Sequence, residues 1–140
     1  MANALTAHTI INGSRNLVIH FSGVADGSGD YSNFELLNVF DYQNEGEAVA
    51  NDYSVLKIAG RNAVGTSMQL KFGSSLNNHV LFYQSPTDNE FSGDWTRYGG
   101  IHPKLVSSDG SIRISTTGYD AAADSLNFTI WLKKKVRTTK

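Results

Sequence analysis

The 140-residue chain has no cysteine, only two prolines and no long run of apolar residues. Without cysteine there is neither a disulfide framework nor a thiolate metal site, so packing and main-chain hydrogen bonds must stabilise the fold. No apolar stretch approaches the roughly 20 residues that span a bilayer, and the N-terminus lacks the basic start and apolar segment of a secretory signal. We therefore expect one soluble domain with no membrane partner.

A strong net charge is also absent, because 12 Lys and Arg residues face 13 Asp and Glu residues. The charges are nevertheless unevenly distributed, since residues 133–140 contain no acid and five cations. These cations are Lys133, Lys134, Lys135, Arg137 and Lys140. We predict an acidic body (1–132) and a basic C-terminal tail (133–140). Such a short basic end is more often solvated, but it can also bind an acidic protein surface. A nucleic-acid partner is not expected, because the chain as a whole has no basic footprint.

Short β-type runs separated by Gly, Asn, Asp and Ser make up most of the chain. In 125–133 every second residue is apolar, which places four apolar side chains on one face of a half-buried strand. Further strands are predicted at 6–12, 16–22, 34–40, 53–61, 67–72, 78–84 and 111–117. No stretch has sustained helical periodicity. The pattern predicts an all-β fold, an antiparallel β-sandwich resembling a jelly roll, with a small β-barrel as the alternative.

The spacing of these runs suggests how some of them pair. Residues 6–12 and 16–22 flank a short connection that contains Gly13 and are predicted to form a hairpin, preceded by a short N-terminal arm. Residues 53–61 and 67–72 are predicted to form a second hairpin. The run 34–40 is apolar on both faces, as expected of a strand that is covered on two sides or that lies at a subunit contact. Its candidate partner-binding residues are Phe34, Leu37 and Val39.

Motifs for catalysis are weak. The four histidines do not have the spacing of a zincin, and there is no Gly-x-Ser-x-Gly elbow and no phosphate-binding glycine loop. Residues 26–30 offer oxygen ligands at alternate positions, but the twelfth position of an EF-hand is Leu37, so a polar turn is favoured over a calcium site. We expect no enzymatic activity, no metal and no cofactor; a small hydrolase using a histidine with Asp26 or Asp94 is the less favoured alternative.

Three aromatic residues invite a separate interpretation. Trp95, Tyr98 and Trp131 could form a stacking platform for a sugar, with nearby Asn and Asp residues bonding to its hydroxyls. Core or subunit contact is favoured, because large aromatic side chains carry much of the energetics of both. We therefore include Trp95 and Tyr98, with Lys133, Lys134, Lys135 and Arg137, among the candidate partner-binding residues and retain a carbohydrate-binding module as an alternative.

Residues 12–23 (Asn-Gly-Ser-Arg-Asn-Leu-Val-Ile-His-Phe-Ser-Gly), followed by Asp-Gly-Ser-Gly-Asp at 26–30, resemble the opening of small virion structural proteins of tailed phages. Later segments are similar to the same family. These segments are 68–70, 93–94, 98–101, 114–118 and 128–130. The acidic stretch 41–52 and the Lys-rich end depart from the pattern.

The resemblance implies a capsid cement or decoration protein, which binds the outer shell, often as a trimer, and holds neighbouring capsomers together. The expected partners are the major capsid protein and further copies of this chain. The expected location is the capsid surface, after assembly in the host cytoplasm. Tail, adaptor and head-fibre components have similar size and composition, so they remain alternatives.

Overall fold

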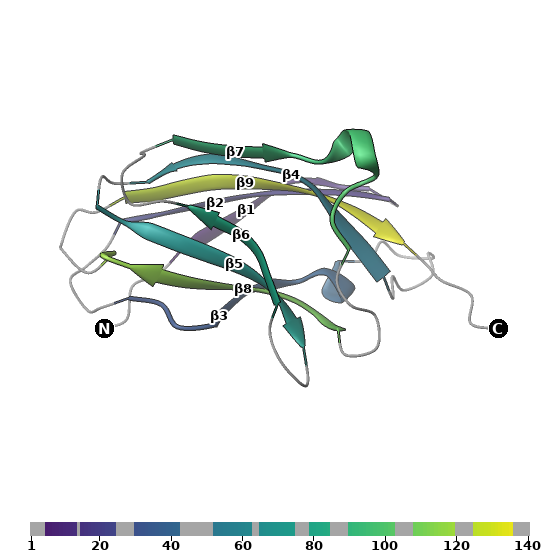
Figure 1. The fold of residues 1–140 in the computed structure, drawn as a ribbon. Coiled ribbons are helices and arrows are strands. Elements are labelled where there is room, and N and C mark those ends of the chain that lie inside the picture. The colour runs from purple at the N-terminus through teal and green to yellow at the C-terminus, as the bar shows by residue number, and fades with distance from the viewer. Residues whose placement is uncertain are drawn as a thin grey trace.

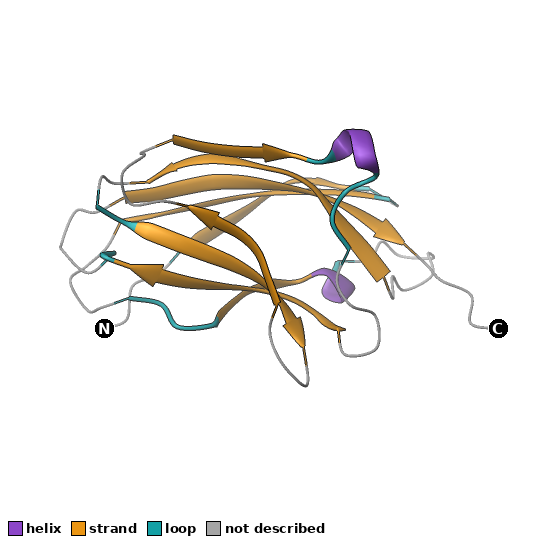
Figure 2. Ribbon diagram, viewed as in Figure 1, coloured by secondary structure: helices purple, strands orange, loops and turns teal. Residues whose placement is uncertain are grey.

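The computed structural model describes residues 5–13, 15–24, 30–42, 52–62, 65–74, 79–84, 90–102, 108–119 and 125–135. These residues form nine strands and two short 3-10 helices (Figures 1 and 2). The strands are β1 (Thr6–Asn12), β2 (Asn16–Val24), β3 (Phe34–Asn38), β4 (Asp52–Asn62), β5 (Ser67–Ser74), β6 (His79–Gln84), β7 (Glu90–Asp94), β8 (Ser108–Thr117) and β9 (Ser125–Lys135). The helices are η1 (Val39–Asp41) and η2 (Thr96–Tyr98). Neither helix is long or apolar enough to cross a membrane.

The strands form two antiparallel sheets that lie one over the other (Figure 1). The five-stranded sheet has the order β1-β2-β9-β4-β7, and the four-stranded sheet has the order β3-β8-β5-β6. The predicted β-sandwich is confirmed, whereas the alternative of a small barrel is not formed by the described strands.

The order of the strands is that of a jelly roll. The antiparallel pairs are nested along the chain: β2 with β9, β3 with β8, β4 with β7 and β5 with β6. Successive pairs belong to alternate sheets. Two further pairings join the two pairs of each sheet: β4 pairs with β9 in the five-stranded sheet, and β5 pairs with β8 in the four-stranded sheet. This is the double Greek-key arrangement of a jelly roll. Strand β1 is an addition at the edge, beside β2.

The core follows from the period-two alternation along each strand. In β9, Leu126, Phe128, Ile130 and Leu132 are all buried, as the sequence predicts, while their neighbours are more exposed. The Phe128 ring lies 5.2 Å from the ring of Phe21, measured between centroids. Burying such side chains contributes about 1.5–3 kcal/mol each, so the inner face of β9 is a major source of stability.

Gly60 lets β4 and β9 approach closely at the centre of the larger sheet. A Cβ atom at this position would lie 2.2 Å from the carbonyl oxygen of Asn127 and 2.5 Å from the Cα of Phe128. The residues paired with Gly60 are Phe91 and Phe128, whose rings contact each other at 6.3 Å. Aromatic rings from the flanking strands thus cover the gap that glycine leaves.

The two predicted hairpins have different outcomes. The first is confirmed: β1 pairs with β2, and the amide of Gly13 donates to the carbonyl of Asn16. The second is wrong, because β4 lies in the five-stranded sheet and β5 in the other. The link between them crosses the sandwich, where Asn62 donates to the carbonyl of Thr66 and the Thr66 hydroxyl donates to Gly118.

The predicted strand 34–40 ends early. Asn38 caps the helix η1, because its side-chain oxygen accepts a hydrogen bond from the amide of Phe40. Leu37 and Val39 are buried in the common core, whereas Phe34 is 47% exposed at the start of the edge strand β3. Leu37 and Val39 are therefore covered within the subunit, as expected of a run that is covered on two sides.

Strand β9 continues past the predicted boundary of the basic tail and ends at Lys135. Lys134 is only 4% exposed, and its ammonium donates to the Asn12 side chain at 2.7 Å and to the Tyr42 carbonyl at 2.9 Å. The first three residues assigned to the tail are thus part of the sandwich. Arg137 lies outside the described residues.

Candidate functional site

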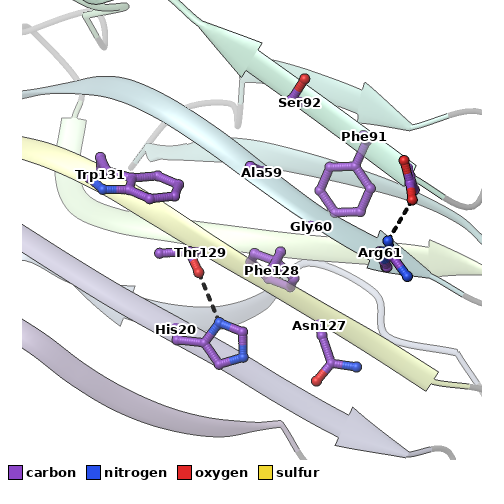
Figure 3. A pocket seen from close by; sticks show the side chains of 11 residues that line it. His20, Ala59, Gly60, Arg61, Phe91, Ser92, Asn127, Phe128, Thr129 and Trp131 are labelled. Atoms are coloured by element: carbon purple, nitrogen blue, oxygen red, sulfur yellow. Dashed lines mark hydrogen bonds and ion pairs between the residues drawn. The ribbon is translucent and has the colours of Figure 1, made fainter.

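A hollow with a volume of about 840 Å³ lies on the outer face of the five-stranded sheet (Figure 3). It is open to solvent and spans β2, β9, β4 and β7. Its lining residues are His20, Ala59, Gly60, Arg61, Glu90, Phe91, Ser92, Asn127, Phe128, Thr129 and Trp131. We call it the outer hollow.

The register of the four strands explains the shape of the outer hollow. Outward side chains align in three rows across β2, β9, β4 and β7, because side chains on neighbouring strands that are paired in register lie side by side. The first row is Val18, Trp131, Lys57 and Asp94; the second is His20, Thr129, Ala59 and Ser92; the third is Ser22, Asn127, Arg61 and Glu90. The middle row contains small side chains on three of its four strands, whereas larger side chains flank it. The outer hollow is therefore a consequence of side-chain size along three cross-strand rows.

Figure 3 shows the resulting arrangement, with Trp131 at one end of the outer hollow and Arg61 and Asn127 at the other. His20 lies on β2 at the side, where its Nδ1 is 2.8 Å from the hydroxyl of Thr129. This contact places His20 on the outward, polar face of β2. It also holds the imidazole in one orientation toward the outer hollow.

The charges around the outer hollow are paired. Arg61 and Glu90 form an ion pair at 2.7 Å, and the Lys57 ammonium lies over the Trp131 ring, 5.0 Å from its centroid. Hydrogen bonds from Thr96 lower the pKa of Asp94, and the Lys57 cation acts in the same direction. Each acid therefore lies beside a cation, and the outer hollow carries little net charge.

Two polar side chains of the outer hollow have no hydrogen-bond partner among the described residues. They are the amide of Asn127 on β9 and the hydroxyl of Ser92 on β7. An amide offers two donors and an acceptor, and a hydroxyl can both donate and accept. Both groups are available to a ligand.

The aromatic platform predicted from the sequence is not assembled. Trp131 lines the outer hollow, but Trp95 packs against Gly93 and meets the ring of Phe82, from the other sheet, at 6.2 Å. Tyr98 is 77% exposed on η2. Only Trp131 of the three residues faces the outer hollow.

Among the other predicted partner-binding residues, Phe34 and Lys133 are exposed, and the Lys135 ammonium contacts the His102 ring at 3.2 Å. Leu37, Val39 and Lys134 are buried, as described above. Sequence reasoning missed Ala59, Ser92 and Asn127 as site residues. Strand periodicity indicates that such residues face outward, but their convergence depends on strand pairing.

A second surface feature is the set of exposed apolar side chains on edge strands. Ile10 and Ile11 on β1 are 54% and 49% exposed, and Val80 and Tyr83 on β6 are about half exposed. Phe34 on β3 completes this group. Three of the four edge strands of the sandwich thus present apolar groups to solvent, which is typical of protein contact surfaces.

Asp30 is the only described residue of the loop 26–30, which was predicted to be a polar turn, since residues 26–29 lie outside the described ranges. Its carboxylate accepts hydrogen bonds from the Thr116 hydroxyl and from the amides of Gly118 and Tyr119. Asp30 therefore fastens the turn after β8 to the chain before β3. No group of three His, Asp or Glu side chains within the described ranges is placed to hold a metal ion.

Two surfaces of this jelly roll are thus available for binding: the outer hollow and the apolar edge strands. Neither contains an arrangement of nucleophile, base and oxyanion donors among the residues described. Comparison with known proteins identified no matching family model, no matching curated protein and no matching solved structure.

Proposed function

We propose that this protein is a non-enzymatic structural protein of a phage virion, a capsid cement or decoration protein that binds the outer shell and stabilises contacts between capsomers. The sequence resemblance described above motivates the proposal. A jelly-roll body supports it, because this architecture occurs in viral capsid domains. A protein that clamps a lattice needs such a rigid body together with exposed contact surfaces.

Strand β1 is the observation that carries the proposal. Six of its seven residues are exposed, so it adds little to the core of its own sandwich. Among the described strands it pairs only with β2, which leaves the opposite edge of its main chain open. Such an edge can accept a strand from a neighbouring chain, and the exposed Ile10 and Ile11 supply apolar contact area beside it.

The other exposed groups fit contacts that are repeated over a lattice. Phe34 on β3 and Tyr83 on β6 lie on edges of the second sheet, and Lys133 offers a cation near the end of β9. Each contact is small, but a trimer on a symmetric shell makes many of them at once, and multivalency multiplies modest affinities. The proposed partners are the major capsid protein and two further copies of this chain. A tail, adaptor or head-fibre protein would use the same surfaces against a different virion partner.

The decisive experiment is co-sedimentation of the purified protein with phage heads that lack it, with the oligomeric mass measured by light scattering. We expect a trimer that re-attaches to the heads. Ile11→Lys should weaken attachment by at least about tenfold, because it places a charge in the proposed apolar contact. Val24→Lys adds the same charge in place of another exposed aliphatic residue outside β1 and should attach normally.

A monomer that does not bind heads would contradict the decoration role. Attachment to tails in the same assay would favour the alternative virion roles. Equal attachment by Ile11→Lys and the parent protein would exclude β1 as the contact.

A further inference from the structure

We infer that the outer hollow is a binding site for a neutral oligosaccharide. This inference is independent of shell attachment, because the outer hollow lies on the face of the five-stranded sheet and not on its β1 edge. It is based on the shape, the aromatic wall, the unpartnered polar groups and the charge balance of the outer hollow.

The shape suits an extended ligand. A volume of about 840 Å³ falls within the range of about 300–1,000 Å³ that is usual for small-molecule sites. The row His20, Thr129, Ala59 and Ser92 forms a floor that runs across four strands. A chain of sugar rings can lie along such a floor, whereas an enclosed ligand would need walls on all sides.

Trp131 supplies the apolar part of the site. The Lys57 ammonium over its ring restricts the orientation of the indole, and atoms of the same indole line the outer hollow. A flat aromatic surface can cover the C–H patch of a pyranose ring while the polar end of the side chain stays hydrated. Stacking on the Trp131 ring would contribute little to the affinity of a ligand that has no apolar patch.

The polar groups match hydroxyls. Asn127, Ser92 and His20 approach the outer hollow from three different strands, and the first two have no partner within the described ranges. Amide, hydroxyl and imidazole groups can each serve a sugar hydroxyl, which both donates and accepts. Their spread over β9, β7 and β2 corresponds to a ligand with several hydroxyls along its length.

The charge balance favours an uncharged ligand at this site. Arg61 is paired with Glu90 at 2.7 Å, and Lys57 lies beside Asp94 in the same row. A phosphate or an acidic peptide would meet a carboxylate beside each of these cations and be repelled by it. A neutral saccharide meets no such repulsion.

The test is binding of the intact protein to an immobilised panel of neutral glucose, galactose, mannose and N-acetylglucosamine oligosaccharides, followed by titration calorimetry of the best binder. Ala59→Arg fills the floor without removing a core side chain, and Trp131→Ala removes the aromatic wall. Each should weaken binding by at least about tenfold. Tyr98→Ala removes an exposed aromatic outside the outer hollow and should bind as the parent does.

Circular dichroism of each variant separates loss of binding from loss of fold. Should Trp131→Ala not fold, Ala59→Arg and Asn127→Ala carry the test. Two results would overturn the inference: no binding to any neutral oligosaccharide of the panel, or unchanged affinity in folded Ala59→Arg.

Discussion

At the scale of single residues, Lys134 behaves unlike the two lysines beside it. Its ammonium is buried and donates to Asn12 and to the Tyr42 carbonyl, so it joins β9 to the β1–β2 hairpin and to the end of η1. Lys134→Ala removes two hydrogen bonds to partly buried acceptors. We expect the free energy of unfolding, measured by urea denaturation, to fall by about 1–3 kcal/mol.

Lys133 provides the matched control, because it is exposed on the same strand. Lys133→Ala should change stability by no more than about 0.5 kcal/mol. Equal stability of the two variants would show that the Lys134 contacts contribute nothing to the fold.

Asp109 gives the protein a defined dependence on acid. Burial of the carboxyl opposes its ionisation, but hydrogen bonds from the Ser111 hydroxyl and amide, with the Arg113 cation, outweigh burial and lower the pKa of Asp109. Because the folded pKa lies below the unfolded value of about 3.9, this stabilisation is present above about pH 4 and is lost as pH falls through the folded pKa. The free energy of unfolding should therefore decrease as the pH falls below about 4.

Urea denaturation between about pH 5 and pH 2 tests the assignment to Asp109. Asp109→Asn cannot ionise, so its stability should decline less over this range than that of the parent protein. If the free energies of unfolding of the two proteins fall in parallel down to the lowest pH, the acid sensitivity does not come from Asp109.

At the scale of strands, the tightest constraint is the contact of β4 with β9 at Gly60. Gly60→Ala would drive a methyl group into the main chain of β9, so the two strands would have to separate. Overpacking of this kind costs about 1–3 kcal/mol or more, and we expect thermal denaturation to show a clearly lowered midpoint. Gly13→Ala is the control, because a Cβ there meets only the Asn16 carbonyl at 3.7 Å. A normal midpoint for Gly60→Ala would mean that the strands can move apart at little cost.

Strand faces could be predicted from the sequence, but among the strand partners only the β1–β2 hairpin could. The alternation in β9 reveals its buried face because burial requires a period of two. The same alternation does not say which strand lies alongside. The 53–61 and 67–72 runs are close in sequence and were expected to pair, yet β4 and β5 belong to different sheets because a jelly roll nests distant strands.

The burial of Lys134 was missed because the strand was predicted to end at residue 133, whereas β9 continues to Lys135. The alternation that ends at Leu132 would place Lys134 on the same inner face, but its partners, Asn12 and Tyr42, lie more than 90 residues earlier in the chain and are known only from the fold. The outer hollow could not be predicted either, because only the register of β4, β7 and β9 shows that Ala59, Ser92 and Asn127 lie close together.

At the scale of the whole molecule, the two proposed binding surfaces are separate and should be separable by mutation. Ile11 lies on the β1 edge, and Ala59 lies on the floor of the outer hollow, with β2 and β9 between their strands. Ile11→Lys should therefore abolish attachment to phage heads while leaving oligosaccharide affinity unchanged, and Ala59→Arg should do the reverse. Both activities can be measured on the same preparations by co-sedimentation and calorimetry. If either variant lost both activities while remaining folded, the two surfaces would be one site, and the saccharide would have to be a component of the attachment itself.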